Sequence, residues 1–159
     1  MELKDWNLSK LGEDIWHKKY QQNNESFDDW INRVSGGNEQ VAQLIVDKKF
    51  LFGGRILSNR GIKDRGITCS NCYVVKPVED NIESIFNTAG KLARTFSYGG
   101  GCGIDISNLR EKGAEVHNAA KTTSGAVSFM DVFELAARVI GQNGRRGALM
   151  ISMDCDHPD

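Results

Sequence analysis

The sequence has almost no excess of charge of either sign. Its 159 residues include 20 lysines and arginines and 21 aspartates and glutamates, which leave a formal net charge of −1. Because no global field favours an anionic partner, we expect neither nucleic acid nor an acidic membrane surface to bind the chain. The proportions of 40% hydrophobic and 26% charged residues are those of a globular protein long enough to build a core.

The sequence also lacks a long apolar run. No segment approaches the roughly 18 residues that a membrane helix needs, and Met1-Glu2-Leu3-Lys4 does not lead into the apolar region of a signal peptide. We therefore expect a cytoplasmic protein without a membrane partner. In that compartment four cysteines are more typical of free or catalytic thiols than of a disulfide framework.

Residues 1–52 predict a small helical lobe, to which we assign no catalytic role. A Ser26-x-x-Asp29 cap precedes one helix, Gly36-Gly37 ends it, and a further helix is expected to start at Asn38. The apolar residues expected to face inward are Leu8, Leu11, Ile15, Trp16, Phe27, Trp30, Ile31, Val34, Val41, Leu44, Ile45 and Phe50.

A change of composition near Gly53 indicates a second domain, residues 53–159. It opens with a glycine-rich, partly irregular connection that leads to a β-prone run at residues 72–75. Asn71 and Pro77 bound this run with turn chemistry. Cys72 is therefore predicted at the start of a strand, where rigid structure would hold its thiol.

A helix and a second strand are predicted next. Asp80-Asn81-Ile82-Glu83 has the pattern of a capping box. The apolar residues that follow have the spacing of a core-facing helix: Ile82, Ile85, Phe86, Ala89, Leu92, Ala93 and Phe96. A glycine loop, residues 99–103, then precedes a strand at 104–106. Its three consecutive glycines allow a backbone to come close to whatever lies at the mouth of the cysteine strand.

The rest of the chain extends this α/β pattern. Residues 108–123 lack periodicity and predict a long loop. A helix is expected from Ser124-Gly125, with its apolar face continuing to Ile140, and a third strand at residues 148–153. The fold class is therefore α/β, with the strands and helices alternating as in βαβ units.

The cysteines leave three hypotheses open. Cys69-x-x-Cys72 has thioredoxin-like spacing, but a strand rather than a helix is predicted after it. With Cys102, Cys155 and the histidines it resembles a zinc site that lacks a second closely spaced pair, so we expect no metal. The third hypothesis is that the thiols are buried and act as small hydrophobes.

The charged residues likewise have ordinary explanations. An aspartate such as Asp80 is common at a helix start and needs no ligand to explain it. Arg110 is typical of a solvent-exposed charge, and His117 is typical of a loop histidine that binds no ligand. Arg145-Arg146 is more informative, because guanidinium groups on a glycine-rich loop can close over phosphates or a base. Spacing alone thus predicts an α/β domain able to bind a nucleotide.

Six motifs carry a resemblance to a known family. They are Ser70-Asn71-Cys72-Tyr73-Val74, Glu79 to Ile85, Gly99-Gly100-Gly101-Cys102-Gly103-Ile104, Ser107-x-x-Arg110-x-x-Gly113, Ser124 to Met130, and Gly141 to Ala148. In this order they resemble the large subunit of ribonucleotide reductase, from about Leu51 to the last residue. The likeness is greatest to the adenosylcobalamin-dependent class, partly because the first lobe is too short for the ATP-cone domain of many class I chains.

The resemblance implies a ten-stranded α/β barrel, of which this chain supplies the N-terminal helices and the first strands. In that family a thiyl radical abstracts the ribose 3′ hydrogen, and a cysteine pair then reduces the 2′ carbon and becomes a disulfide. Cys72 matches one member of that pair, whose partner lies on a later strand, so Cys69 is not the partner. Asn71, Cys72 and the backbone of Gly101 would border the ribonucleotide substrate.

The resemblance also implies an allosteric site for a deoxynucleoside triphosphate or ATP at a homodimer interface. Asp80, Asn81 and Ile82 would meet the ribose and base, and Arg110 the phosphates. The loop of Gln142, Asn143, Gly144, Arg145, Arg146 and Gly147 would relay effector identity to the active site. His117 stands where some members carry a second phosphate-binding arginine, and Gly54-Arg55 where they carry a Ser/Thr-Pro pair near the substrate phosphates.

The family's radical cysteine and second reducing cysteine would lie beyond Asp159. We therefore expect the chain to be inactive alone, to need the C-terminal portion of the same enzyme, and to be re-reduced by a thioredoxin-like protein. No residue here is assignable to adenosylcobalamin. The competing hypothesis is a nucleotide-binding regulatory module that kept the effector site and lost the chemistry.

Overall fold

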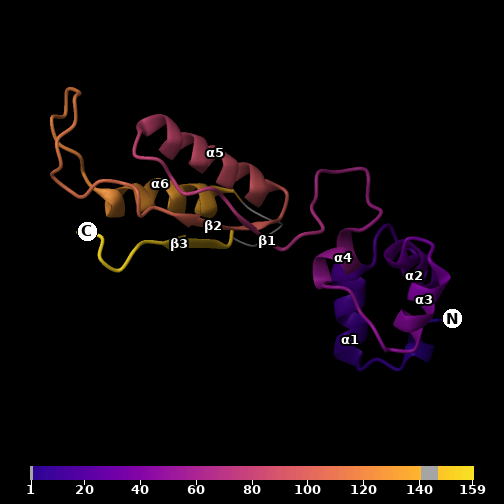
Figure 1. Ribbon diagram of the computed structural model, residues 1–159. Coiled ribbons are helices and arrows are strands. Elements are labelled where there is room, and N and C mark those ends of the chain that lie inside the picture. The colour runs from indigo at the N-terminus through magenta and orange to yellow at the C-terminus, as the bar shows by residue number, and fades with distance from the viewer. Residues whose placement is uncertain (1, 141–146) are drawn as a thin grey trace. The chain divides into compact units, whose positions relative to one another are not determined.

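The computed structural model describes residues 2–140 and 147–159. These residues form two compact units, one ending at Ser70 and the other spanning Asn71–Asp159 (Figure 1). The division lies later than the composition change near Gly53. The glycine-rich connection contains a short helix, α4 (Gly54–Asn59), and Leu57 of this helix is buried in the same apolar cluster as Trp30. Among the described residues no helix is long and apolar enough to cross a membrane.

The first unit is helical, as predicted. Besides α4 its elements are the 3-10 helix η1 (Leu3–Trp6), α1 (Lys10–Ile15), the π-helix η2 (Trp16–Tyr20), α2 (Phe27–Ser35) and α3 (Glu39–Val46). The predicted starts of α2 and α3 are confirmed, because Ser26 Oγ accepts from Asp29 N at 3.1 Å and Asn38 Oδ1 accepts from Val41 N at 3.1 Å. Gly36 ends α2 in the left-handed conformation at φ 70°.

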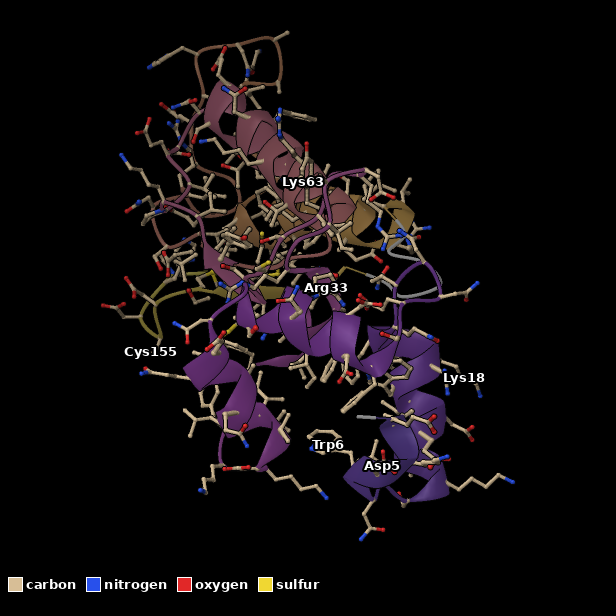
Figure 2. The ribbon with its side chains drawn as sticks, turned by 90° about the vertical axis from the view of Figure 1, so that its right-hand side faces the viewer. Asp5, Trp6, Lys18, Arg33, Lys63 and Cys155 are labelled. Atoms are coloured by element: carbon tan, nitrogen blue, oxygen red, sulfur yellow. The ribbon has the colours of Figure 1, made fainter. Side chains whose placement is uncertain are left out.

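Four aromatic residues, Trp6, Trp16, Phe27 and Trp30, form the centre of this unit. Arg33, labelled in Figure 2, joins its helices through a bidentate pair with Glu25 and a 2.6 Å bond to the carbonyl of Arg60.

The prediction of an inward-facing side chain was wrong for three residues of this unit. Leu11, Leu44 and Phe50 are exposed. For Leu44 the reason is helical phase: α3 turns Val41, Ala42, Ile45 and Val46 toward the cluster, and position 44 lies roughly 130° around the helix from the middle of that stripe.

The second unit contains a parallel sheet of three strands in the order β1 (Cys72–Val74), β2 (Gly101–Asp105), β3 (Leu149–Ser152). Two helices, α5 (Ile82–Ser97) and α6 (Ala126–Val139), pack against each other and against the sheet (Figure 1). The predicted alternation of strands and helices is confirmed. The second strand, however, starts at Gly101 rather than at residue 104, so Gly101 and Gly103 belong to the sheet and not to a loop.

The two faces of the sheet differ. Cys102 and Ile104 are buried against the helices, with Leu92, Phe96 and Phe133. Val74 and Met150, which both pair with Gly103, are 92% and 70% exposed. One face is therefore the core of this unit, and the other is open. The expected inward positions Ile82 and Phe86 are also exposed, because α5 buries the neighbouring stripe of Ile85, Thr88, Leu92 and Phe96.

The segment predicted as a long loop is ordered by its own hydrogen bonds. An antiparallel bridge joins Glu115 and Thr122, and Thr123 N donates to Ala114 O at 3.0 Å. Val116 N donates to Lys121 O at 2.8 Å. The segment is thus a hairpin-like excursion between β2 and α6 that sequence periodicity did not reveal.

Candidate functional site

Cys72 is the first residue of β1 and its side chain is exposed. It pairs in parallel register with Gly101, while Val74 pairs with Gly103. A Cβ added at Gly103 would meet nothing within 4 Å. Since alternate residues of a strand share a face, Cys72 and Val74 lie on the open face beside two residues without side chains. The thiol can therefore be approached from above the sheet.

Asn71, Cys72 and Gly101 lie next to one another in the structure. Gly101 N donates to Asn71 O at 2.8 Å, so this amide is already used in the sheet. A Cβ on Gly101 would lie 3.3 Å from both the Cβ and the carbonyl oxygen of Ala148. The close approach that requires glycine at 101 is thus between neighbouring chain segments.

Gly100 has a different neighbour. A Cβ at this position would lie 2.8 Å from Tyr73 Cε2 and 2.9 Å from Thr95 Cγ2. Part of the glycine run is therefore explained by packing within the unit.

The other thiols differ from one another. All four cysteines are free, with Cys69, Cys72 and Cys155 exposed and Cys102 buried. Burial raises the pKa of the Cys102 thiol, against the opposing effect of a hydrogen bond with the Thr95 side chain. The buried-thiol hypothesis is right for Cys102 alone.

Neither a thioredoxin-like site nor a zinc site fits this arrangement. Cys72 begins a strand, not the helix of a thioredoxin-like motif. Among the described residues no group of three or more His, Cys, Asp or Glu side chains could hold a metal ion.

A second cluster lies at the start of α5. Asp80 Oδ2 accepts from Arg110 Nε at 2.5 Å and Asp80 Oδ1 accepts from Arg110 N at 3.3 Å. Arg110 Nη1 also donates to Glu115 O at 2.8 Å. Two of the predicted effector residues are therefore in contact, and the arginine is anchored to the hairpin-like excursion.

The prediction that residues 80–83 form the capping box of α5 was wrong, because other residues cap this helix. The N-cap of α5 is Asn81, whose Oδ1 accepts from Ser84 N at 2.7 Å, while Ser84 Oγ accepts from Glu79 N at 3.0 Å. Asp80 is consequently not needed as the cap, and its carboxylate meets Arg110 instead.

The remaining predicted effector residues are less closely grouped. Ile82 is the exposed first residue of α5, and His117 is exposed in the excursion. Gly147 N donates to Ala137 O at 3.1 Å, and a Cβ there would lie 2.7 Å from the ring of Phe96. Gln142, Asn143, Gly144, Arg145 and Arg146 lie outside the described residues.

Sequence reasoning missed the polar contacts of the C-terminal segment, residues 154–159, in which Figure 2 labels Cys155. His157 Nε2 lies 2.6 Å from Leu109 O. Asp159 accepts from Lys112 N at 2.8 Å and from Ala126 N at 2.7 Å. These partners are 33 to 48 positions away along the chain, so no local pattern could reveal them.

Residues 70–159 match the family described as "Ribonucleotide reductase, barrel domain". The chain is 40% identical over 122 residues to a vitamin B12-dependent ribonucleoside-diphosphate reductase of Mycobacterium tuberculosis, which covers 76% of this chain and 17% of that protein. It is 44% identical over 140 residues to the enzyme of the same name from Thermoplasma acidophilum, covering 85% and 18%.

A solved structure agrees in fold. The class Id ribonucleotide reductase alpha subunit of Actinobacillus ureae aligns with a TM-score of 0.78 and 21% identity, over 96% of this chain and 29% of that one. The chain spans less than a fifth of the length of these two curated reductases. It belongs to the ribonucleotide reductase family, and its residues 70–159 correspond to part of that family's barrel domain.

Proposed function

We propose that this chain supplies the N-terminal part of a ribonucleotide reductase, contributing one redox cysteine and the effector site. The observation that carries the proposal is the exposed thiol of Cys72 at the start of a parallel strand, beside Gly101 and on the open face of the sheet. The neighbouring strand β2 offers hydrogen atoms instead of side chains at Gly101 and Gly103. A ribose ring could therefore lie against the sheet within reach of the sulfur.

The proposed reaction requires a second thiol as well as Cys72. Cys72 and a cysteine of the C-terminal portion each give up a hydrogen and form a disulfide; the ribose 2′ hydroxyl leaves as water and a hydrogen takes its place. The 2′ carbon is reduced and the two sulfurs are oxidised. A thioredoxin-like dithiol would then reduce the disulfide for the next turnover.

Adenosylcobalamin is proposed as the radical source because the two curated relatives are named vitamin B12-dependent. When bound, it would supply the radical that starts the reaction. Among the residues that the structure describes, no group of three or more His, Cys, Asp or Glu side chains could hold a metal ion.

The effector site is proposed around the Asp80–Arg110 pair. Arg110 would donate to effector phosphates, and Asp80, Asn81 and Ile82 would meet the ribose and base of a deoxynucleoside triphosphate or ATP. The position of the pair at the start of α5 supports this, because helix N-termini favour anions. His117 and the loop of residues 142–147 are proposed to complete the site.

Two protein partners follow from the same proposal. β1 and β3 each have one neighbour in the described sheet, and parallel sheets are stable when both faces are covered and their edges paired. We propose that the C-terminal portion of the enzyme completes the sheet. A second copy would dimerise beside the effector site, covering the exposed apolar residues Ile82 and Phe86 of α5 and Val127, Leu135 and Val139 of α6. The assembled enzyme would act in the cytoplasm.

Reconstitution tests the proposal. The 159-residue chain is mixed with a chain carrying the rest of the reductase, adenosylcobalamin, effector and a dithiol, and deoxynucleotide formation is followed. We expect no product from the chain alone, product from the mixture, loss of multiple turnovers with Cys72→Ser, and most activity retained with the matched control Cys69→Ser. If Cys72→Ser and Cys69→Ser retain the same activity, Cys72 takes no part in the reaction. Effector binding without turnover in any mixture would favour the regulatory-module alternative.

A further inference from the structure

The C-terminal segment forms a clip over the turn that carries Arg110. Asp154 N donates to Ser107 Oγ at 2.9 Å, which places the segment alongside the turn that follows β2. His157 then contacts the carbonyl of Leu109, and the carboxylate of Asp159 accepts from Lys112 N. The clip therefore holds the backbone one residue before Arg110 and two residues after it.

The clip defines the state of the His157 ring. A carbonyl oxygen only accepts, so the 2.6 Å contact with Leu109 O requires a hydrogen on Nε2. A backbone amide only donates, so the 3.1 Å contact from Asp159 N requires a free lone pair on Nδ1. The geometry thus specifies the neutral ring with its hydrogen on Nε2, and each ring nitrogen serves a different part of the clip.

Asp159 joins two elements with one carboxylate. Oδ1 accepts from Lys112 N, and Oδ2 accepts from Ala126 N at the start of α6. α6 has no capping side chain of its own, because its N-cap is Gly125. A Cβ on Gly125 would lie 2.5 Å from Asp159 Oδ2 and 2.8 Å from Lys112 Cβ. Glycine at 125 is therefore what leaves room for the carboxylate to bridge α6 and the Arg110 turn.

We propose that His157 and Asp159 are positioning residues for Arg110. Among the described residues outside the clip, Asp80 and the carbonyl of Glu115 hold Arg110 through its guanidinium group and its backbone amide. The side chains of Arg110 and Asp80 are 38% and 34% exposed. Exposed ion pairs hold a side chain weakly. Fixing the backbone on both sides keeps the guanidinium directed at the start of α5 before any ligand arrives, which lowers the entropy lost on binding. The inference rests on the proposed role of Arg110 in binding effector phosphates.

The test uses the 159-residue chain and two measurements. The first is the hydrogen exchange rate of the Arg110 Nε–H group by NMR without nucleotide, which reports its bond to Asp80. The second is the affinity for dATP by calorimetry. His157→Leu and Asp159→Ala remove the clip, and His157→Gln restores a side-chain N–H near Leu109 O. Asp156→Ala is the control: it removes one negative charge from an exposed residue of the same segment.

We expect the Arg110 Nε–H to exchange about three to ten times faster in His157→Leu and Asp159→Ala, and dATP affinity to fall about threefold to tenfold, the range expected for one lost hydrogen bond. His157→Gln should recover most of both, and Asp156→Ala should change neither. Unchanged Arg110 exchange in both clip variants would overturn the inference. Faster exchange in a chain that binds no dATP would uphold the positioning and refute the effector site. A third outcome would uphold the effector site and refute the positioning. In it, Arg110→Ala loses dATP binding, while the clip variants keep the Arg110 exchange rate and the dATP affinity of the parent chain.

Should one of the two clip variants unfold, the comparison of the other clip variant with the parent chain still decides. A purely structural role would lower the unfolding midpoint without changing Arg110 exchange at temperatures where the variant is folded, and that result would also overturn the inference.

Discussion

Arg110 Nε lies 2.5 Å from Asp80 Oδ2, although 30 positions separate the two residues. Both side chains are about one-third exposed, and exposed pairs of this kind contribute only about 0–1 kcal/mol to folding stability. The pair therefore contributes little to holding the fold together. It places a cation and an acceptor side by side at the start of α5, where an anionic ligand is favoured.

Replacement of Arg110 by alanine should weaken nucleotide binding. Hydrogen bonds to charged groups contribute about 1.5–3 kcal/mol, so we expect dATP or dTTP affinity to fall roughly tenfold to a hundredfold in calorimetry. Arg138→Ala is a matched control, because Arg138 is an exposed arginine paired with Glu134 on α6. Equal losses in the two variants would show a general effect of charge, and no loss in Arg110→Ala would place the site elsewhere.

Two glycines should respond to alanine in opposite directions. Gly90 lies inside α5, and a Cβ there would meet nothing within 4 Å, so Gly90→Ala should raise the free energy of unfolding by about 0.5–1 kcal/mol. At Gly100 the added methyl would press on Tyr73 and Thr95, and we expect a loss of about 1–3 kcal/mol. Urea unfolding at equilibrium measures both, and shifts in the same direction would contradict the surroundings described for one of the two glycines.

The four thiols should differ in their reaction with iodoacetamide at about pH 8. Cys69, Cys72 and Cys155 are exposed and should be alkylated in the native chain. Cys102 is buried, and burial raises its pKa, so less of the reactive thiolate is present and the reagent reaches it poorly. We expect Cys102 to react only after unfolding, which mass spectrometry of digested protein can follow. Modification of Cys102 at the rate of the other three would contradict its place in the core.

Acid should remove a stabilising contribution of Asp105. The Ser152 hydroxyl, followed by the Ser107 amide, lowers the pKa of this carboxyl. A lowered folded-state pKa means that the contribution is complete above the unfolded value and is lost as pH falls through the folded value. The difference in unfolding free energy between the parent chain and Asp105→Asn should therefore shrink below about pH 4. Ser152→Ala should reduce the acid dependence in part, and a difference independent of pH would refute the assignment.

Local patterns in the sequence were sufficient for much of the fold. Ser26 and Asn38 start helices because their side chains accept hydrogen bonds from amides three positions ahead, an interaction encoded within one turn. Cys72 was predicted at the start of a strand because the residues after it are aromatic or β-branched. The parallel direction of neighbouring strands agrees with their alternation with helices, because a βαβ unit joins two parallel strands.

Only the tertiary structure decided which residues meet across the chain. Ile82 and Phe86 have the same helical spacing as buried residues of α5, yet they are exposed, because the partner surface and not the period selects the buried stripe. Asp80 could have capped α5, but Asn81 does so, and the Asp80 carboxylate accepts a hydrogen bond from Arg110 instead. The contacts of His157 and Asp159 join positions 33 to 48 residues apart. Propensity and periodicity act over one or two turns, whereas these contacts depend on where folding brings distant backbone donors and acceptors together.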